Sequence, residues 1–123
     1  MKKISKLGTL QRKADKLLQI ENKRLNKYCE ACGGKNEVGH HWIEKSRSAN
    51  LRYDFRNIIP LCNSCHAKIH NVFGNSVVGG LDVAQAIIKK RGKKWKERMD
   101  IDGKKIIKVN REYYEGIIKK LSP

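Results

Sequence analysis

The sequence contains few aromatic residues, few acidic residues and no long apolar run. A membrane-spanning helix needs about 18 apolar residues in succession, and no stretch approaches that length, so we expect no membrane partner. Residues 1–6 are basic and lead into a charged segment, not an apolar one, so we predict no signal peptide and a cytoplasmic location. With two Trp, four Tyr and two Phe, the chain lacks the interleaved aromatic side chains on which single-stranded RNA stacks, which argues against an RNA-binding protein.

Positive charge, by contrast, is abundant. Lysine and arginine number 28 against 12 aspartate and glutamate residues, which gives a formal net charge of +16. The basic residues run through the whole chain and do not form a detachable tail. Charge of this size and distribution is typical of proteins that bind nucleic acid through its phosphates, although a solvated basic surface also accounts for it. We therefore expect a nucleic-acid partner.

The cysteines and histidines are gathered in one segment. All four residues of each type lie within 29–70, and the cysteines form two C-x-x-C pairs, Cys29 with Cys32 and Cys62 with Cys65. Two such pairs predict one structural Zn²⁺ held by four thiolates. In a domain of 123 residues, of which 39% are hydrophobic, a metal cross-link is a common aid to stability. Disulfides or redox-active pairs are the alternatives, which a cytoplasmic location disfavours.

Hydrophobic spacing predicts a helix, a hairpin and a second helix in the N-terminal half of the chain. Residues 1–28 are expected to form one basic amphipathic helix, whose basic face contacts either solvent or phosphate. Short strands are expected at 37–43 and 58–61, joined by a long polar connection over 44–56. A helix is then predicted from Asn63 to about Phe73, ended by Gly74.

The C-terminal region of the chain is predicted to be helical. After a linker at 75–81, Asp82 is expected to cap a helix that runs to Arg91 and is followed by Gly92. Another helical turn or two is expected from Trp95, and Asn110 is expected to cap a last helix. Packing together with a basic surface is the simplest interpretation of this region.

The spacing of the histidines indicates a second site. His66 and His70 are four residues apart on a predicted helix and so project from one face, which suits a shared ion. His40 and His41 are neighbours on a predicted strand, which in regular form would point them to opposite faces. Because Cys65 directly precedes His66, two separate Cys₂His₂ zinc sites would be cramped, and we assign the cysteines to zinc and the imidazoles to other chemistry. Any one of these histidines alone could be a buried core residue.

These residues form a recognisable set: His40-His41, Asn57, and Cys65-His66 with His70, between two C-x-x-C pairs. The set resembles the motif of the HNH, or ββα-metal, endonucleases. The resemblance implies that His41 is the general base and that Asn57 holds the loop and orients that base. It also implies one catalytic divalent ion, Mg²⁺, Mn²⁺, Ni²⁺ or Zn²⁺, with the ligands His40, His66 and His70.

A looser similarity extends from Cys29 onward. Segments 39–46, 51–57 and 89–92, together with Tyr113 and Tyr114, resemble the phage NinG/Rap recombination nucleases. This similarity implies a phage-type role in recombination or DNA processing inside a prokaryotic cell.

Together these features predict an α+β protein with a small zinc-stabilised ββα-metal core at 29–74. A basic helix at 1–28 precedes the core and a basic helical extension at 75–123 follows it, in one compact domain; no oligomeric state is indicated. The predicted function is metal-dependent hydrolysis of DNA phosphodiester bonds, and the alternative is a non-catalytic zinc-stabilised DNA-binding module. We expect contacts mainly to the phosphate backbone, with Lys45, Arg47 and Arg52 as candidates, and we expect Trp42 in the core.

Overall fold

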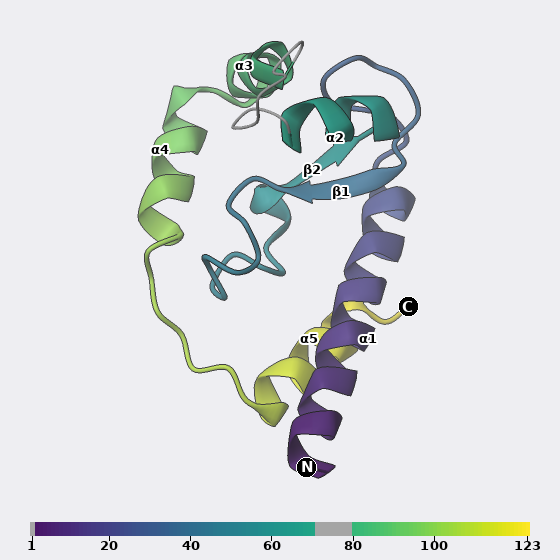
Figure 1. Cartoon of the computed structure of the whole chain (residues 1–123), viewed down its shortest axis with the longest axis vertical. Coiled ribbons are helices and arrows are strands. Elements are labelled where there is room, and N and C mark those ends of the chain that lie inside the picture. Colours follow the sequence, from purple (N-terminus) through teal and green to yellow (C-terminus); the bar gives the residue numbers. More distant parts are fainter. Residues whose placement is uncertain (1, 71–79) are drawn as a thin grey trace.

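The computed structural model describes residues 2–70 and 80–123, and within them it contains five α-helices and one two-stranded antiparallel sheet (Figure 1). In chain order the elements are α1 (Lys2–Leu25), β1 (Val38–His41), the 3₁₀ helix η1 (Phe55–Asn57), β2 (Ile58–Leu61), α2 (Asn63–His70), α3 (Gly80–Arg91), α4 (Lys93–Asp102) and α5 (Arg111–Leu121). The predicted α+β fold class is confirmed. No helix in the described ranges is long and apolar enough to cross a membrane.

The hairpin of β1 and β2 is closed at its outer edges by neighbouring segments. Gly39 lies opposite Pro60, which has no N–H to donate. The N–H and carbonyl of Gly39 point away from β2 and bond the side-chain amide of Gln19 on α1, at 2.8 and 3.0 Å. On the other strand the carbonyl of Pro60 accepts a hydrogen bond from the N–H of Glu30 at 2.8 Å. Backbone groups that would otherwise be free at the edges of this small sheet are therefore satisfied.

Helix α1 approaches the hairpin so closely that a side chain at position 39 would not fit. A Cβ atom on Gly39 would lie 2.7 Å from Cγ2 of Ile58 and 3.1 Å from the side chain of Asn22 on α1. Glycine at this position is what allows Gln19 to reach the strand.

Strand β2 contributes to two hydrophobic clusters, because successive side chains of a strand point to opposite faces. Ile58 belongs to a cluster that joins α1 to α5: Ala14, Leu18, Tyr53, Ile58, Tyr114 and Leu121. Ile59 belongs to a cluster that joins the hairpin to α2 and α3: Cys29, Ile59, Leu61, Cys65, Ile69, Val83 and Ile87. In Figure 1, α5 crosses α1 below the hairpin, while α2 and α3 lie above it. Trp42 packs against the second cluster, as expected, and its ring centroid is 5.2 Å from that of Trp95 on α4.

Most elements predicted for the N-terminal half are present with shifted ends. Helix α1 ends at Leu25 and not at residue 28, and β1 is shorter than the predicted 37–43, whereas β2 has the predicted bounds. Helix α2 begins at Asn63 as predicted. Its predicted end at Gly74 lies outside the described residues.

Among the C-terminal helices, the predicted cap at Asp82 is wrong, whereas the helix end before Gly92 and the cap at Asn110 are confirmed. Helix α3 already begins at Gly80, within the predicted linker 75–81, so Asp82 lies in the first turn and is not the N-cap; its negative charge still suits that end of the helix. Gly92, with φ 100°, separates α3 from α4. Asn110 caps α5 by accepting a hydrogen bond from the N–H of Tyr113 at 2.9 Å.

Candidate active site and zinc site

The four cysteine sulfurs meet at one point beside the hairpin. Their Sγ atoms all lie within 4.8 Å of one another, and all four thiols are free. The Sγ atoms of Cys32 and Cys62 are 3.7 Å apart, and a tetrahedral ion with Zn–S bonds of about 2.3 Å would hold its sulfurs about 3.8 Å apart. Donor type and spacing both fit Zn²⁺, which confirms the predicted zinc site of Cys29, Cys32, Cys62 and Cys65.

Backbone N–H groups around this site favour thiolates. The N–H of Gly34 donates to Sγ of Cys32, and the N–H of Cys65 donates to Sγ of Cys62, both at 3.4 Å. Burial raises the pKa of Cys29, but backbone N–H groups, led by that of Cys32, outweigh burial and bring this pKa down to about 7. Burial and the neighbouring thiols raise the pKa of Cys65, so zinc binding must displace protons from part of the set.

Three of the four histidines face one another across β1 and α2. The ring centroid of His40 is 5.3 Å from that of His66 and 5.1 Å from that of His70, and the last two rings are 4.3 Å apart. One ring nitrogen from each lies within 4.8 Å of the others. The Nε2 atoms of His66 and His70 are 2.7 Å apart, and at that distance a proton or a cation must lie between the two lone pairs.

The three imidazoles suit a metal ion. Burial, followed by repulsion from His66 and His70, lowers the pKa of His40 to about 3. Burial also lowers the pKa of His66. The two rings are therefore neutral at neutral pH, which is the form that binds metal. The His40, His66 and His70 set thus fits a divalent transition ion by donor type, since imidazole is a ligand for Zn²⁺, Ni²⁺ and similar ions.

His41 is held in one orientation by a backbone carbonyl. Its Nε2 lies 2.8 Å from the main-chain oxygen of Arg52. A carbonyl oxygen can only accept a hydrogen bond, so Nε2 carries the proton and Nδ1 keeps its lone pair. Burial lowers the pKa of His41 by more than its hydrogen bond to Arg52 raises it. His41 is therefore a neutral imidazole with one nitrogen free to accept a proton, beside the His40 set.

Asn57 is fully buried and ties the hairpin to the connection that precedes β2. Its Oδ1 accepts from the N–H of Ile43 at 2.7 Å, and its Nδ2 donates to the carbonyl of Ile43 at 3.0 Å and to that of Leu51 at 3.3 Å. Its own carbonyl accepts from the N–H of Trp42 at 2.9 Å. Asn57 thus fixes both the chain that leaves His41 and the chain that leads to Arg52.

All four imidazoles line one cavity of about 620 Å³. His40 and His41 are neighbours at the end of β1, and both are among the residues that line it. Cationic side chains from two further elements line the same cavity: Lys45, Arg47 and Lys96. Lys45 and Arg47 are exposed and form no salt bridge with any described residue, whereas Lys96 pairs with Asp100 at 3.1 Å. The cavity therefore combines metal-binding, proton-accepting and phosphate-binding groups.

Arg52, the third residue predicted to bind DNA, is placed differently. Its guanidinium forms two hydrogen bonds with the carboxylate of Asp15 on α1, at 2.7 and 3.1 Å, and its side chain is 17% exposed. The hydroxyl of Tyr53 donates to the same carboxylate at 2.8 Å. The Arg52 side chain is therefore engaged inside the protein, while its backbone oxygen holds His41.

Sequence reasoning missed three residues that support the site. Asp15 is the only acidic residue among the first 20, and this isolation in a basic helix is a signal that could have identified it. Gln19 and Lys96 carry no comparable signal, because nothing near them in the sequence indicates that α1 and α4 reach the cavity.

The class of protein follows from comparison with known families. Residues 29–72 match the family model of the HNH endonucleases, and this match spans both cysteine pairs and all four histidines. Residues 29–72 therefore carry an HNH endonuclease domain match, and the four clustered cysteines fit the zinc-stabilised core of such a domain. No curated protein and no solved structure matches the chain.

Proposed function

We propose that the protein is a metal-dependent HNH endonuclease that hydrolyses phosphodiester bonds of DNA. The observation that carries this proposal is the hydrogen bond of His41 to the carbonyl of Arg52, which leaves Nδ1 able to accept a proton on a residue that lines the same cavity as His40, His66 and His70. A domain that only bound DNA would need neither this fixed tautomer nor the facing imidazoles.

In this proposal His41 acts as the general base. Its Nδ1 removes a proton from the attacking water, and a neutral imidazole suits this role near neutral pH. The hydrogen bond to Arg52 keeps the ring in place and stabilises the positive charge that the ring gains when it accepts the proton. Asn57 does not contact the reacting atoms in this scheme. It holds the backbone of Ile43, which follows His41, and that of Leu51, which precedes Arg52.

The remaining groups handle the phosphate. A divalent ion bound by His40, His66 and His70 would supply Lewis-acid stabilisation of the phosphate and of the leaving oxygen. Lys45 and Arg47, exposed at the cavity and free of salt bridges to described residues, hold the phosphate backbone by charge-assisted hydrogen bonds. Arg52 is a positioning residue in this scheme, since its guanidinium is bound to Asp15.

Cleavage of a supercoiled plasmid tests the proposal. Purified wild-type protein, His41→Ala and the surface control Lys119→Ala are compared with Mg²⁺, Mn²⁺, Ni²⁺ or Zn²⁺ added and with none. We expect ion-dependent nicking by the wild type and Lys119→Ala, and its loss in His41→Ala, which should still fold and bind DNA. DNA binding without cleavage of any substrate would support the non-catalytic binding module instead. The phage-type recombination role stays a prediction from the looser resemblance.

A further inference from the structure

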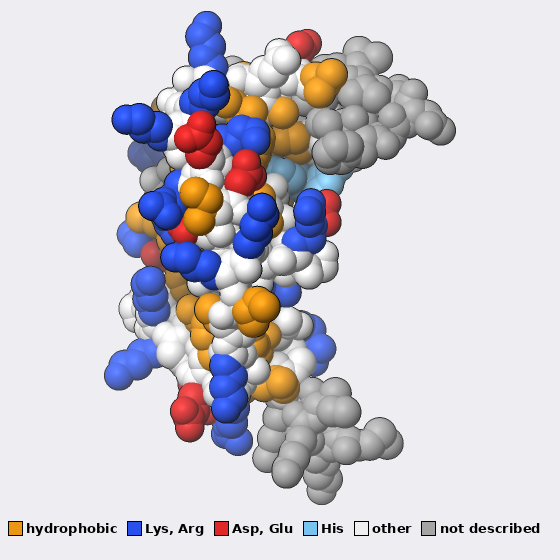
Figure 2. Space-filling view, turned by 90° about the vertical axis from the view of Figure 1, so that its left-hand side faces the viewer, with side chains coloured by type: hydrophobic (Ala, Val, Ile, Leu, Met, Phe, Trp, Pro, Cys, Tyr) orange, Lys and Arg blue, Asp and Glu red, His pale blue; other side chains and the backbone are white. Residues whose placement is uncertain are grey.

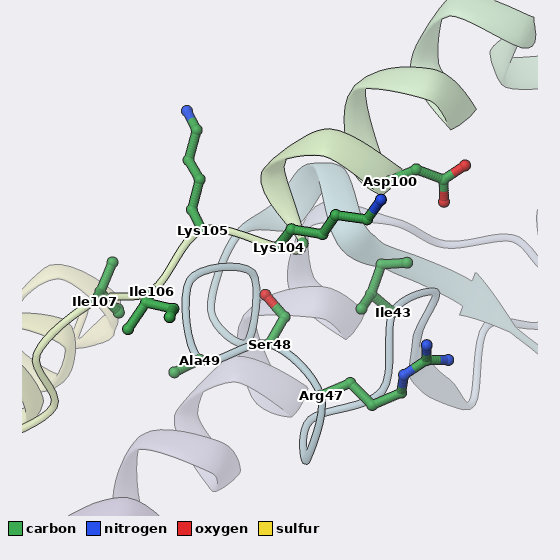
Figure 3. Close-up of a pocket in the computed structure, with 10 residues that line it drawn as sticks. Ile43, Arg47, Ser48, Ala49, Asp100, Lys104, Lys105, Ile106 and Ile107 are labelled. Carbon is green, nitrogen blue, oxygen red and sulfur yellow. The ribbon is translucent and has the colours of Figure 1, made fainter.

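A second cavity, of about 570 Å³, adjoins the histidine cavity. It lies between the connection 44–56 and the segment that joins α4 to α5, and Arg47 lines both cavities. Figure 3 shows Ile106 and Ile107 on that segment beside Ser48 and Ala49 of the connection. Arg47 is therefore common to the walls of both cavities.

The two walls of the second cavity are held together at both ends. At the α4 end, the side-chain amide of Asn50 donates to the carbonyl of Asp102 at 3.0 Å. At the α5 end, the hydroxyl of Tyr113 donates to the carbonyl of Ala49 at 3.4 Å. The segment between α4 and α5 lacks regular secondary structure, and these bonds hold the two helices that flank it against the connection. The cavity is thus a preformed feature of the fold.

The charge of the cavity favours an anion. Arg47 and Lys104 form no salt bridge with any described residue, and Lys105 pairs with Asp102 at 3.3 Å. The one acidic residue that lines the cavity is Asp100, which is paired with Lys96 at 3.1 Å. The unpaired charge on the walls is therefore positive.

The same cavity also has apolar lining residues. Ile43, Ala49 and Ile107 are half-buried in its walls, and Ile106, which is 98% exposed, lies at its rim. Figure 2 shows the molecule from the side of α4, where hydrophobic side chains are exposed among lysine and arginine side chains. Cationic and apolar groups side by side match the phosphate and the base of a nucleotide.

We infer that this cavity binds one unpaired nucleotide of the cleaved strand, next to the phosphodiester held in the histidine cavity. Arg47 and Lys104 contact its phosphate, and Ile106 packs against the face of its base. A base inside a continuous duplex is covered by its stacked neighbours and cannot offer that face. The inference deepens the proposed nuclease function, on which it rests, by naming a substrate class: DNA with unpaired nucleotides at the cleavage site.

Binding of two matched DNAs tests the inference. Fluorescence anisotropy, without added divalent ion so that the DNA stays intact, gives Kd for a continuous duplex and for the same duplex with a short single-stranded gap. The proteins are the wild type, the cavity variants Ile106→Ser and Lys104→Ala, and the controls Ile20→Ser and Lys119→Ala, which change exposed residues of the same type on α1 and α5. Circular dichroism checks that each variant is folded.

We expect the wild type and both controls to bind the gapped duplex about tenfold more tightly, a difference of about 1.4 kcal/mol. Each cavity variant should lose most of that preference while its affinity for the continuous duplex matches that of its control. Equal affinity of the wild type for the two DNAs, or an unchanged preference in both cavity variants, overturns the inference. A preference for the gapped duplex without cleavage in the presence of any ion would refute the nuclease proposal but support nucleotide binding in the second cavity. Plasmid cleavage without that preference would support the nuclease proposal and refute nucleotide binding in the second cavity.

Discussion

Nε2 of His41 lies 2.8 Å from the backbone oxygen of Arg52, and the guanidinium of the same arginine is bound by Asp15 on α1. One residue thus links the proposed base to the N-terminal helix, with its backbone facing His41 and its side chain facing Asp15. Helix α1 lies outside the segment that matches the HNH family, residues 29–72. The carbonyl that faces His41 thus belongs to a residue whose side chain is bound from outside that segment.

Replacement of Asp15 by Asn should therefore slow cleavage without removing a group that touches the substrate. The neutral amide holds Arg52 less firmly, so the carbonyl that orients His41 gains freedom, and we expect kcat to fall about tenfold with little change in KM. Steady-state cleavage kinetics measure this effect. Glu21→Gln is the matched control, because Glu21 forms an ion pair on the same helix with Arg24, whose side chain is exposed, and it should behave as the wild type. An unchanged kcat in Asp15→Asn would show that Arg52 holds His41 unaided.

The Asp15 ion pair should also make stability depend on pH at the acid end. Burial raises the pKa of Asp15, but the hydrogen bonds from Arg52 and Tyr53 outweigh it and leave the pKa below the ordinary value of 3.8. A lowered folded-state pKa contributes stability above about pH 4 that is lost as the pH falls through that folded-state pKa. Urea unfolding gives the free energy of unfolding of the wild type and of Asp15→Asn. The wild type should be more stable by an amount that is constant from about pH 7 to 5 and that becomes smaller below about pH 4. A difference that grows on acidification would contradict this assignment.

Local spacing explains why the ligand sets could be predicted and the supporting residues could not. C-x-x-C pairs and histidines four residues apart indicate shared ligands whatever surrounds them. In the structure the four cysteines come together, and so do His40, His66 and His70. The bond between Arg52 and Asp15 joins residues 37 apart, and it exists only because α1 docks beside the hairpin. Arg52 therefore looked like a DNA contact in the sequence, since a basic residue in a polar loop gives no sign of a buried partner.

Separate roles for the two ligand sets predict separate responses to mutation. Cys65→Ser removes a buried zinc ligand, and because zinc binding is coupled to folding we expect loss of bound zinc together with loss of the cooperative unfolding transition. His66→Ala should instead retain one tightly held zinc per chain and a cooperative transition, while it loses cleavage. Elemental analysis and thermal unfolding of the two variants measure this. Loss of the tightly held zinc in His66→Ala would contradict the division of cysteines and histidines between two sites.

Asn57 should not tolerate aspartate, although the two side chains have nearly the same shape. The Nδ2 of Asn57 faces the carbonyl oxygens of Ile43 and Leu51, and a carboxylate there would turn an acceptor toward both in a fully buried position. We expect Asn57→Ala to lower the free energy of unfolding by about 2 kcal/mol or more, and Asn57→Asp to lower it further at neutral pH. Urea unfolding measures both, with Asn110→Asp as the control, because the Asn110 side chain accepts a hydrogen bond from the N–H of Tyr113 and a carboxylate can do the same. Equal stability of Asn57→Asp and the wild type would mean that the amide donates no essential hydrogen bond.

The salt dependence of DNA binding should distinguish the basic residues of the connection 44–56 from one another. Lys45 and Arg47 line the histidine cavity without a salt bridge to any described residue, so each can release a counterion when it meets a phosphate. We expect Lys45→Ala and Arg47→Ala each to lower the slope of log K against log salt by about 1. Arg52→Lys, which keeps the charge but cannot form both bonds to Asp15, should leave that slope unchanged and reduce cleavage instead. A slope that falls in Arg52→Lys would identify its guanidinium as a phosphate contact after all, made at the expense of its bond to Asp15.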